Sequence, residues 1–246
     1  MAISIRPEQT PRPQSPPAEQ PAAPASAPAL SRLAEAAIAE LGQRVIEIGC
    51  GAGHLTRRLL DREQVVALDP AREHVARVLS EFPTQTNLEA YSMEITSPRF
   101  RQLARFRPDS VLCIHGLERI EDDHRALFHM LSVLRPGGRV VVLAHACPWL
   151  FSPLDFALGH YRRYSADALR VTAEAVGLRV VRLDYVSFAG IASWWWHARL
   201  LGRTDRGPGV GTRLDRWIDP VLGRIGQWAQ MPAGSGLFAV LERPGY

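Results

Sequence analysis

The feature that most constrains the fold is a glycine-rich turn between a short strand and an amphipathic helix. Residues 44–48 read as a strand, glycine then occupies alternate positions from Gly49 to Gly53, and residues 53–61 have helical spacing. Glycine adopts a positive φ easily and places no side chain between a ligand and the backbone. A ligand can therefore lie against this turn and the N-terminus of the helix that follows. The segment predicts a ligand-binding strand–turn–helix unit.

Strand-like and helix-like segments alternate along most of the chain. Such alternation is typical of a parallel sheet with helices packed on both faces. We therefore predict an α/β fold, a Rossmann-like, doubly wound and mostly parallel seven-stranded sheet with an antiparallel C-terminal strand. The expected strands are residues 44–48, 64–68, 88–93, 110–114, 139–143, 178–185 and 236–242. The expected helices are residues 31–41 (capped by Ser31), 53–61, 71–81, 100–105, 122–134, 165–177 and 213–230.

The two ends of the chain differ from this alternating part. Residues 1–28 contain eight prolines and almost no large apolar side chain, so they bury too little surface to offset the entropy lost on ordering. We expect a disordered tail there, followed by one domain over residues 29–246. Within that domain, residues 144–164 and 186–230 read as lids or insertions on the substrate side.

The composition excludes several kinds of chemistry. All 29 basic residues are arginine, so the chain has no lysine for a Schiff base or for a phosphate-binding P-loop. The formal charge is +4, but the arginines are interleaved with 25 acids, a pattern that does not favour nucleic acid as a partner. The eight histidines show no i, i+4 pairing with a carboxylate, so no metal site is expected. We expect a small-molecule partner, and the oligomeric state stays open.

Cysteine content and hydropathy indicate the cellular compartment. Three cysteines are too few and too scattered for a disulfide framework, which favours a reducing cytoplasm. No apolar segment reaches the roughly 18 residues that a membrane span needs, and membrane association is not favoured. The tryptophans of Trp194–Trp196 suit either a membrane interface or a wall of the core or substrate pocket. The second interpretation is preferred.

An acid that follows the second strand narrows the ligand class. Asp69 stands twenty residues after Gly49 at the end of that strand, where a carboxylate can accept both hydroxyls of a ribose. Glu47, inside the first strand, would repel a pyrophosphate but suits a ligand that carries an ammonium group. His54 occupies the position of the third glycine in the dinucleotide-binding spacing, which argues against NAD. The residues therefore predict a nucleoside with a cationic group.

Several motifs together resemble class I S-adenosylmethionine-dependent methyltransferases. They are residues 47–53 (EIGCGAG), Asp69, residues 111–123, and residues 134–138 (LRPGG), and the resemblance covers about residues 31–242. It implies S-adenosylmethionine as the cofactor, in contact with the residues that match the family's donor site. These donor-site residues are Glu47, Gly49, Cys50, Gly51 and Gly53 on the methionine side, Asp69 on the ribose, and Pro70, Glu94 and Ile95 on the adenine side, with His115 nearby.

A second stretch, residues 148–165, resembles a subgroup of small bacterial enzymes in this family whose substrate is undefined. The chain departs from the subgroup pattern in three places. His115 stands where asparagine is usual, Arg119 where histidine is usual, and His145 where proline is expected. The two histidines follow the fourth and fifth strands, at the ligand-binding edge of such a sheet. We therefore expect the methyl acceptor to differ from the norm of the subgroup.

The acceptor side offers candidate catalytic groups. A phenol or alcohol acceptor gains from a nearby base, whereas an amine needs only to arrive unprotonated. His145 and His115 are the first candidates for that role, followed by Tyr161, and each also suits a purely structural role. Residues of the connection that are expected to bind substrate or close over the site are Trp149, Asp155, His160, Tyr161, Arg162 and Tyr164. Asp155 is expected to pair with Arg162 or Arg163 and so hold this connection in place.

The sequence thus favours a biosynthetic methyltransferase that acts at N or O of a small-molecule or lipid-like metabolite. Two alternatives stay open. One is another reaction of the same sulfonium donor, intramolecular cyclisation or aminocarboxypropyl transfer, which releases methylthioadenosine. The other is a donor-binding subunit without catalysis.

Overall fold

A computed structural model describes residues 27–186 and 234–245 of the chain. The segment 1–26, most of the predicted insertion 186–230, the predicted helix 213–230 and the cluster Trp194–Trp196 lie outside the described residues. Among the described residues, no helix combines the length and the apolar character needed to cross a membrane.

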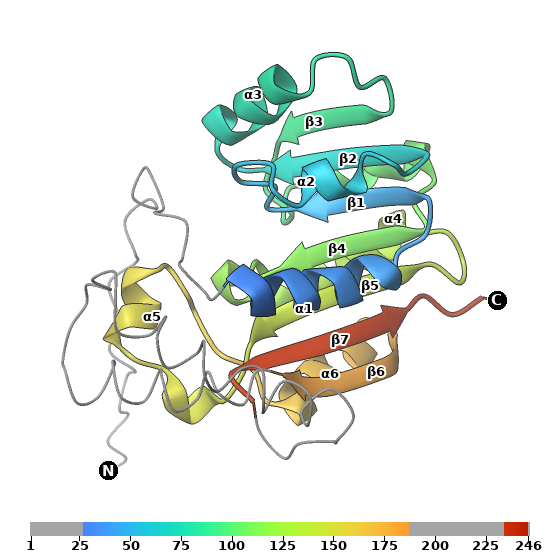
Figure 1. The fold of residues 1–246 in the computed structure, drawn as a ribbon. Coiled ribbons are helices and arrows are strands. Elements are labelled where there is room, and N and C mark those ends of the chain that lie inside the picture. Colours follow the sequence, from blue (N-terminus) through green and yellow to red (C-terminus); the bar gives the residue numbers. More distant parts are fainter. Residues whose placement is uncertain (1–26, 187–233, 246) are drawn as a thin grey trace, which may run out of the picture.

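The described part is built on one seven-stranded sheet with the order β3-β2-β1-β4-β5-β7-β6 (Figure 1). The pairs within β3-β2-β1-β4-β5 are parallel, and β7 is antiparallel to both of its neighbours. This confirms the predicted mostly parallel sheet with an antiparallel C-terminal strand. The strands are β1 (Arg44–Ile48), β2 (Gln64–Asp69), β3 (Leu88–Ser92), β4 (Ser110–Ile114), β5 (Arg139–His145), β6 (Arg179–Val186) and β7 (Gly236–Glu242).

Helices cover both faces of the sheet (Figure 1). One face carries α1 (Ala27–Ala39), α2 (Thr56–Leu59) and α3 (Arg72–Glu81). The other face carries the 3-10 helix η1 (Pro98–Phe106), α4 (Asp123–Val133) and α6 (Ala166–Ala175). The remaining helices are η2 (Leu117–Arg119), η3 (Pro148–Leu150) and α5 (Pro153–Ala157), which lie in the connections after β4 and β5.

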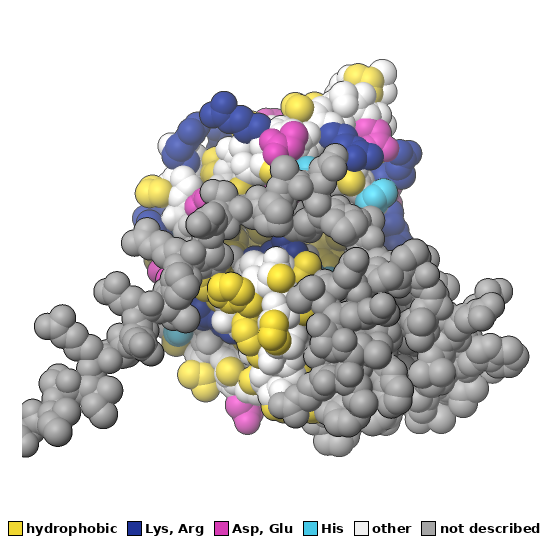
Figure 2. All heavy atoms as spheres, turned by 90° about the vertical axis from the view of Figure 1, so that its left-hand side faces the viewer, with side chains coloured by type: hydrophobic (Ala, Val, Ile, Leu, Met, Phe, Trp, Pro, Cys, Tyr) yellow, Lys and Arg dark blue, Asp and Glu magenta, His cyan; other side chains and the backbone are white. Residues whose placement is uncertain are grey.

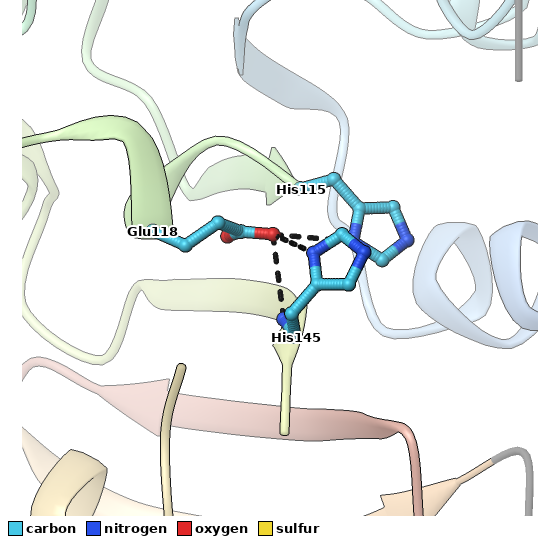
Figure 3. A group of neighbouring side chains, drawn as sticks. All are labelled: His115, Glu118 and His145. Carbon is cyan, nitrogen blue, oxygen red and sulfur yellow. Dashed lines mark hydrogen bonds and ion pairs between the residues drawn. The ribbon is translucent and has the colours of Figure 1, made fainter. Parts of the chain in front are cut away.

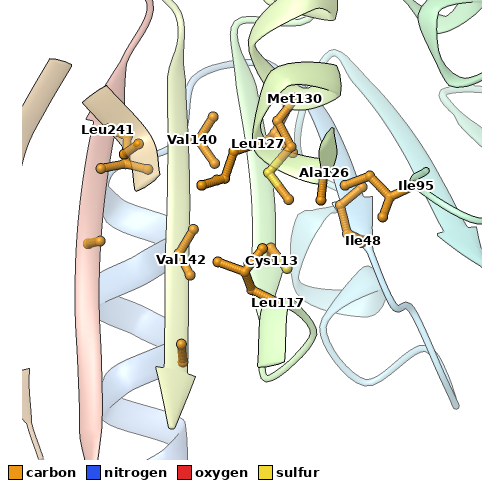
Figure 4. Close-up of a cluster of buried hydrophobic side chains, with 14 of the residues drawn as sticks. Ile48, Ile95, Cys113, Leu117, Ala126, Leu127, Met130, Val140, Val142 and Leu241 are labelled. Carbon is orange, nitrogen blue, oxygen red and sulfur yellow. The ribbon is translucent and has the colours of Figure 1, made fainter. Parts of the chain in front are cut away.

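The core lies on both faces of the sheet because successive side chains of a strand point to opposite sides. Val141 of β5 belongs to the cluster that also contains side chains of α1 and α3, whereas Val140 and Val142 belong to the cluster that contains side chains of α4 and α6. Figure 4 shows the second of these clusters, in which Leu127 and Met130 of α4 meet the central strands. The near-continuous apolar runs of the central strands are the signature of a sheet buried on both faces.

Three predicted helices differ from the observed ones. The first begins at Ala27, so that Ser31 lies inside α1 instead of capping it. The helix expected over residues 53–61 is only the four residues of α2. It does not begin at Gly53, because this residue has a φ of +81° and cannot belong to a right-handed helix. The segment predicted as a helix over residues 100–105 is η1, a 3-10 helix whose start is capped by the Ser97 side chain, which accepts from the Arg99 amide.

Candidate active site

The glycine-rich turn connects the end of β1 to α2 with three left-handed residues. Gly49, Gly51 and Gly53 have φ values of +78°, +51° and +81°. A Cβ added at Gly49 or Gly51 would meet nothing within 4 Å, whereas one at Gly53 would lie 3.2 Å from Cγ2 of Val78 on α3. The first two glycines therefore leave open space over the turn, and the third allows α3 to pack closely.

Asp69 closes this turn from the end of the neighbouring strand β2. Its Oδ2 accepts a hydrogen bond from the Gly51 amide at 3.0 Å, and its Oδ1 accepts one from the Ala71 amide at 2.9 Å. The ring Nδ1 of His74, on α3, lies 3.0 Å from the same Oδ1. Sequence reasoning missed His74, for which only the distance of five residues from Asp69 gave a signal. The carboxylate thus ties β2, the glycine turn and α3 together.

Glu47 lies beneath the turn with a carboxyl that is 1% exposed. Its Oε2 accepts a hydrogen bond from the hydroxyl of Thr56 at 2.7 Å, and its Oε1 has no hydrogen-bond partner. Burial, assisted by the charge of Asp69, raises the pKa of Glu47 to about 7 despite the hydrogen bond from Thr56. An acid with one unsatisfied oxygen at this place suits a ligand that brings a positive charge.

The other predicted donor-site residues lie at the same edge of the sheet. Cys50 is buried, and this burial raises the pKa of its thiol to about 12, so it behaves as a small apolar residue. Pro70 and Glu94 are exposed, and Ile95 is buried. Ser92 donates a hydrogen bond to the Pro70 carbonyl at 3.0 Å, which joins the ends of β2 and β3.

His115, Glu118 and His145 form a second group at this edge (Figure 3). His145 is the last residue of β5, and His115 follows the adjacent parallel strand β4, with its amide bonded to the Leu143 carbonyl at 2.7 Å. The two rings are 4.4 Å apart. Nδ1 of His145 is hydrogen-bonded to Oε1 of Glu118, and Nδ1 of His115 lies 3.4 Å from the same oxygen. The parallel register thus brings together side chains that are far apart in sequence.

The charge states in this group follow from burial and from the mutual contacts. Burial alone would raise the pKa of Glu118, but the His115 and His145 imidazoles outweigh it and hold the pKa well below its usual value. Burial lowers the pKa of His145 to about 4, even though Glu118 opposes the shift. Burial thus favours the neutral form of the His145 imidazole, and the two imidazoles favour the ionised form of Glu118.

Two atoms of the group are buried without a hydrogen-bond partner, Oε2 of Glu118 and Nδ1 of His115. The Glu118 side chain is 0% exposed. In addition, His115 has a φ of +50°, a left-handed conformation that costs a non-glycine residue about 1–3 kcal/mol. Unsatisfied polar atoms and backbone strain therefore occur at the same residues.

The connection after β5 is anchored by Asp155, which is 0% exposed. Oδ1 of Asp155 accepts from Nε of Arg163 at 2.9 Å and lies 3.2 Å from Nδ1 of His160, and Oδ2 accepts from the Ser152 amide. Asp155 pairs with Arg163, one of the two expected partners. The His160 ring is 4.9 Å from that of His145, so the anchor of this connection extends to the histidine group.

Arg162, the other expected partner, pairs with Asp123 at 2.8 Å. The same carboxylate accepts the hydroxyl of Tyr164, which is 2% exposed and belongs to the interior. Tyr161 is different, because its side chain is 40% exposed and only its amide is tied down, to the Glu118 carbonyl at 2.8 Å. Of these three predicted residues, Tyr164 is buried, whereas Tyr161 and Arg162, whose side chain is 34% exposed, can both be reached from solvent.

Exposed apolar side chains gather on the same connection. Figure 2 shows hydrophobic side chains on the face of the molecule at the α5 end of the sheet. Trp149 is 62% exposed, the largest exposed fraction in this group. The other exposed apolar residues of the connection are Phe151, Phe156, Leu158 and Tyr161.

The expectation of no metal site rested on spacing in the sequence. The structure brings one ligand atom each from His115, Glu118 and His145 within 4.8 Å of one another. His115 and Glu118 are three residues apart, and His145 joins them only through the pairing of β4 with β5. Sequence reasoning chose both histidines because they follow neighbouring strands, but it missed Glu118.

A comparison with protein families identifies the domain. The family model for a methyltransferase domain matches residues 22–183 of this chain. The matched region contains the glycine turn, Asp69 and the group of His115, Glu118 and His145.

The relatives of the chain include ubiquinone biosynthesis O-methyltransferases. The protein from Xanthomonas axonopodis pv. citri is 32% identical over 182 residues, which cover 67% of this chain and 73% of the relative. The protein from Aeromonas salmonicida is 29% identical over 104 residues, which cover 41% of this chain and 42% of the relative. Among solved structures, an S-adenosylmethionine-dependent methyltransferase from Mesorhizobium loti matches with a TM-score of 0.61 at 16% identity, covering 87% of this chain and 98% of that one.

Proposed function

This chain belongs to the methyltransferase-domain family and is an S-adenosylmethionine-dependent methyltransferase, and from this premise we propose that it methylates a hydroxyl oxygen of a small or lipid-like acceptor. We choose oxygen as the methylated atom because His115, Glu118 and His145 lie together at the carboxyl ends of β4 and β5.

The donor would lie over the glycine turn. Gly49 and Gly51 leave the space that the methionine part needs, and Oε1 of Glu47 is a free acceptor for its ammonium group. Asp69 would accept the ribose hydroxyls, because a carboxylate has about four lone-pair sites and its bonds to the amides of Gly51 and Ala71 use only some of them. Pro70 and Ile95 would flank the adenine.

The acceptor hydroxyl would meet the histidine group. Attack by oxygen on the methyl carbon requires the hydroxyl to lose its proton, which nearby imidazole and carboxylate groups favour. The oxygen then bonds to the methyl carbon, the carbon–sulfur bond breaks, and its electron pair neutralises the sulfonium to give S-adenosylhomocysteine. An amine acceptor has no need of such a group, and the relatives named O-methyltransferases support the same choice.

The connection after β5 supports an acceptor with an apolar part. Trp149, Phe151 and Tyr161 expose apolar surface on the connection that follows His145, and the Tyr161 amide is bonded to the Glu118 carbonyl. Clustered exposed apolar residues are common where ligands bind. The three cysteines are all unpaired, which fits the cytoplasmic setting that the sequence suggests.

Product analysis tests this function. The purified chain is incubated with S-adenosylmethionine and matched pairs of acceptors, a hydroxylated aromatic ring and the same ring with an amine, each with and without an alkyl chain. We expect S-adenosylhomocysteine and a product that is heavier by one CH2, from the hydroxyl member. Methylation of the amine alone would overturn the proposal. Methylthioadenosine without added acceptor would favour cyclisation or aminocarboxypropyl transfer instead.

A further inference from the structure

We propose that His115, Glu118 and His145 bind one divalent transition-metal ion, of the kind represented by Zn²⁺, and that this ion activates the acceptor hydroxyl. The binding site stands on the geometry of the three residues. Its role in catalysis rests on the proposed function.

The separation of the ligand atoms suits an ion. One ligand atom from each residue lies within 4.8 Å of the other two, and Nδ1 of His115 is 3.4 Å from Oε1 of Glu118. A tetrahedral ion with bonds of about 2.0–2.2 Å holds its ligand atoms roughly 3.4 Å apart. Small rotations of side chains that already face one another would therefore complete the site.

Buried polar atoms without hydrogen-bond partners are a second indication of a bound ion. Oε2 of Glu118 and Nδ1 of His115 are buried and have no hydrogen-bond partner. A buried polar atom without a partner costs free energy. The other oxygen of Glu118, Oε1, accepts from the His145 amide at 3.3 Å and is bonded to the His145 ring, so the unsatisfied atoms are confined to Oε2 and to Nδ1 of His115. A metal ion between the three side chains would satisfy Nδ1 of His115 and would bind Oε1 of Glu118, the carboxylate oxygen that faces both histidines (Figure 3).

The kinds of ligand decide which ion fits. Two imidazoles and one carboxylate match the nitrogen and oxygen preference of Zn²⁺ and related ions, whereas Mg²⁺ and Ca²⁺ prefer oxygen ligands alone. Catalytic zinc sites use three protein ligands and leave a fourth position for water or substrate. The three side chains here supply that number.

Neighbouring groups hold the ligands in place. The His115 amide bonds to the Leu143 carbonyl at 2.7 Å, and the Tyr161 amide bonds to the Glu118 carbonyl at 2.8 Å. The His145 ring lies against that of His160, which Asp155 holds. Such outer contacts orient metal ligands, and the left-handed backbone of His115 shows that its position is imposed by the surrounding structure.

The ion would act on the acceptor as a Lewis acid. The hydroxyl oxygen takes the open position, and the ion lowers the pKa of the bound O–H, so that its proton passes to solvent water. The oxygen then attacks the methyl group, and the electron pair of the carbon–sulfur bond stays on sulfur. The ion keeps its charge throughout, because the reaction involves no oxidation or reduction.

Metal binding without any acceptor tests the site. Tag-free full-length chain is stripped with EDTA and titrated with Co²⁺ by visible absorption and with Zn²⁺ by calorimetry. We expect one ion per chain and at least a 100-fold weaker affinity in Glu118→Gln, His145→Gln and His115→Asn. Asparagine is chosen at position 115 because it tolerates positive φ. His124→Gln, which removes an exposed histidine of α4, should bind like the wild type.

Melting temperature and donor binding show that each variant is folded. If Glu118→Gln fails to fold, His115→Asn and His145→Gln still decide the outcome. No binding of Co²⁺ or Zn²⁺ to the folded wild type, or the same affinity in both of these variants as in His124→Gln, would overturn the site.

An activity assay distinguishes metal binding from the proposed role of the ion in catalysis. We expect stripped protein to lose hydroxyl methylation and to recover it with one equivalent of Zn²⁺ or Co²⁺, while donor binding is unchanged. Full methylation by the stripped protein would overturn the role of the ion and leave the proposed function standing. One bound ion without hydroxyl methylation by the loaded protein would support the site and overturn the proposed function.

Discussion

Thr56, the first residue of α2, donates a hydrogen bond from Oγ1 to Oε2 of Glu47 at 2.7 Å. Glu47 belongs to β1 and Thr56 follows the glycine turn, so this bond closes the turn from below. Both side chains are almost completely buried. The glycine turn therefore rests on a buried polar contact that bulk water does not replace.

Removal of that hydroxyl should destabilise the chain. Thr56→Val keeps the shape and leaves Oε2 of Glu47 without a donor, which we expect to lower the free energy of unfolding by about 1–3 kcal/mol. Denaturant unfolding measures the change. Thr172→Val is the matched control, because its hydroxyl bonds only to the Ala168 carbonyl within α6. Equal effects of the two substitutions would contradict the account of the turn.

Glu47 should make stability depend on pH. Its pKa is raised from 4.5 to about 7 in the folded chain, so the folded state binds the proton more tightly than the unfolded one. The contribution of this group to stability is therefore fully present below pH 4.5, and it is lost as the pH rises through 7. Denaturant unfolding at a series of pH values measures this dependence. Glu47→Gln should abolish the loss of stability between pH 4.5 and 7. The same dependence of stability on pH in Glu47→Gln as in the wild type would show that Glu47 is not its cause.

Donor affinity should show the opposite trend. An ammonium group pairs with the ionised form of Glu47 and not with the protonated form. We therefore expect S-adenosylmethionine to bind several-fold more tightly as the pH rises from about 6 to 7.5, with release of a proton on binding. Calorimetry in two buffers of different ionisation enthalpy measures both. A flat profile, or the same profile in Glu47→Gln, would remove Glu47 from the donor site.

Asp69→Ala should weaken S-adenosylmethionine binding by roughly 1–3 kcal/mol through lost charge-assisted hydrogen bonds. The structure adds a second cause, because the Gly51 amide loses its acceptor. Asp61→Ala, at a side chain that is 76% exposed, is the control for the loss of one negative charge. Calorimetry that gives both variants the wild-type affinity would exclude Asp69.

Alanine at two glycines should separate donor binding from folding. Gly51→Ala places its methyl group in open space, so the cost in stability is that of a positive φ, about 1–2 kcal/mol. Donor affinity should fall more steeply, because the methyl group enters the space proposed for the ligand. Gly53→Ala instead meets Val78 at 3.2 Å and should lose more stability than Gly51→Ala. A larger loss of stability in Gly51→Ala than in Gly53→Ala, measured by denaturant unfolding, would contradict the roles assigned to these two glycines.

The sheet could be predicted from the sequence because its signals are local. Each central strand is a short apolar run, and Gly137 and Gly138 mark the turn before β5. The length of α2 could not be predicted, since helical spacing does not reveal that Gly53 is left-handed. The short helix α5 was missed as well, although Ser152 and Asp155 form a capping box at its start, which is a local signal.

The sequence predicted which residues the structure brings together at the glycine turn, and it predicted only part of the group around His145. Asp69 follows from its distance to Gly49, a spacing that the strand–turn–helix unit dictates. The partnership of Glu118 with His145 depends on the register of β4 against β5, which no local pattern encodes. The choice of Arg163 over Arg162 by Asp155 likewise depends on how the connection folds back.

In the proposed function, the group of His115, Glu118 and His145 serves methyl transfer to oxygen. The most direct test is a single turnover with methyl-labelled S-adenosylmethionine and a hydroxylated acceptor, comparing the wild type with His145→Gln. We predict label on the acceptor oxygen in the wild type, and a rate at least 100-fold lower in His145→Gln with unchanged donor affinity. Label on nitrogen, or an equal loss of rate and donor affinity in the variant, would contradict the account.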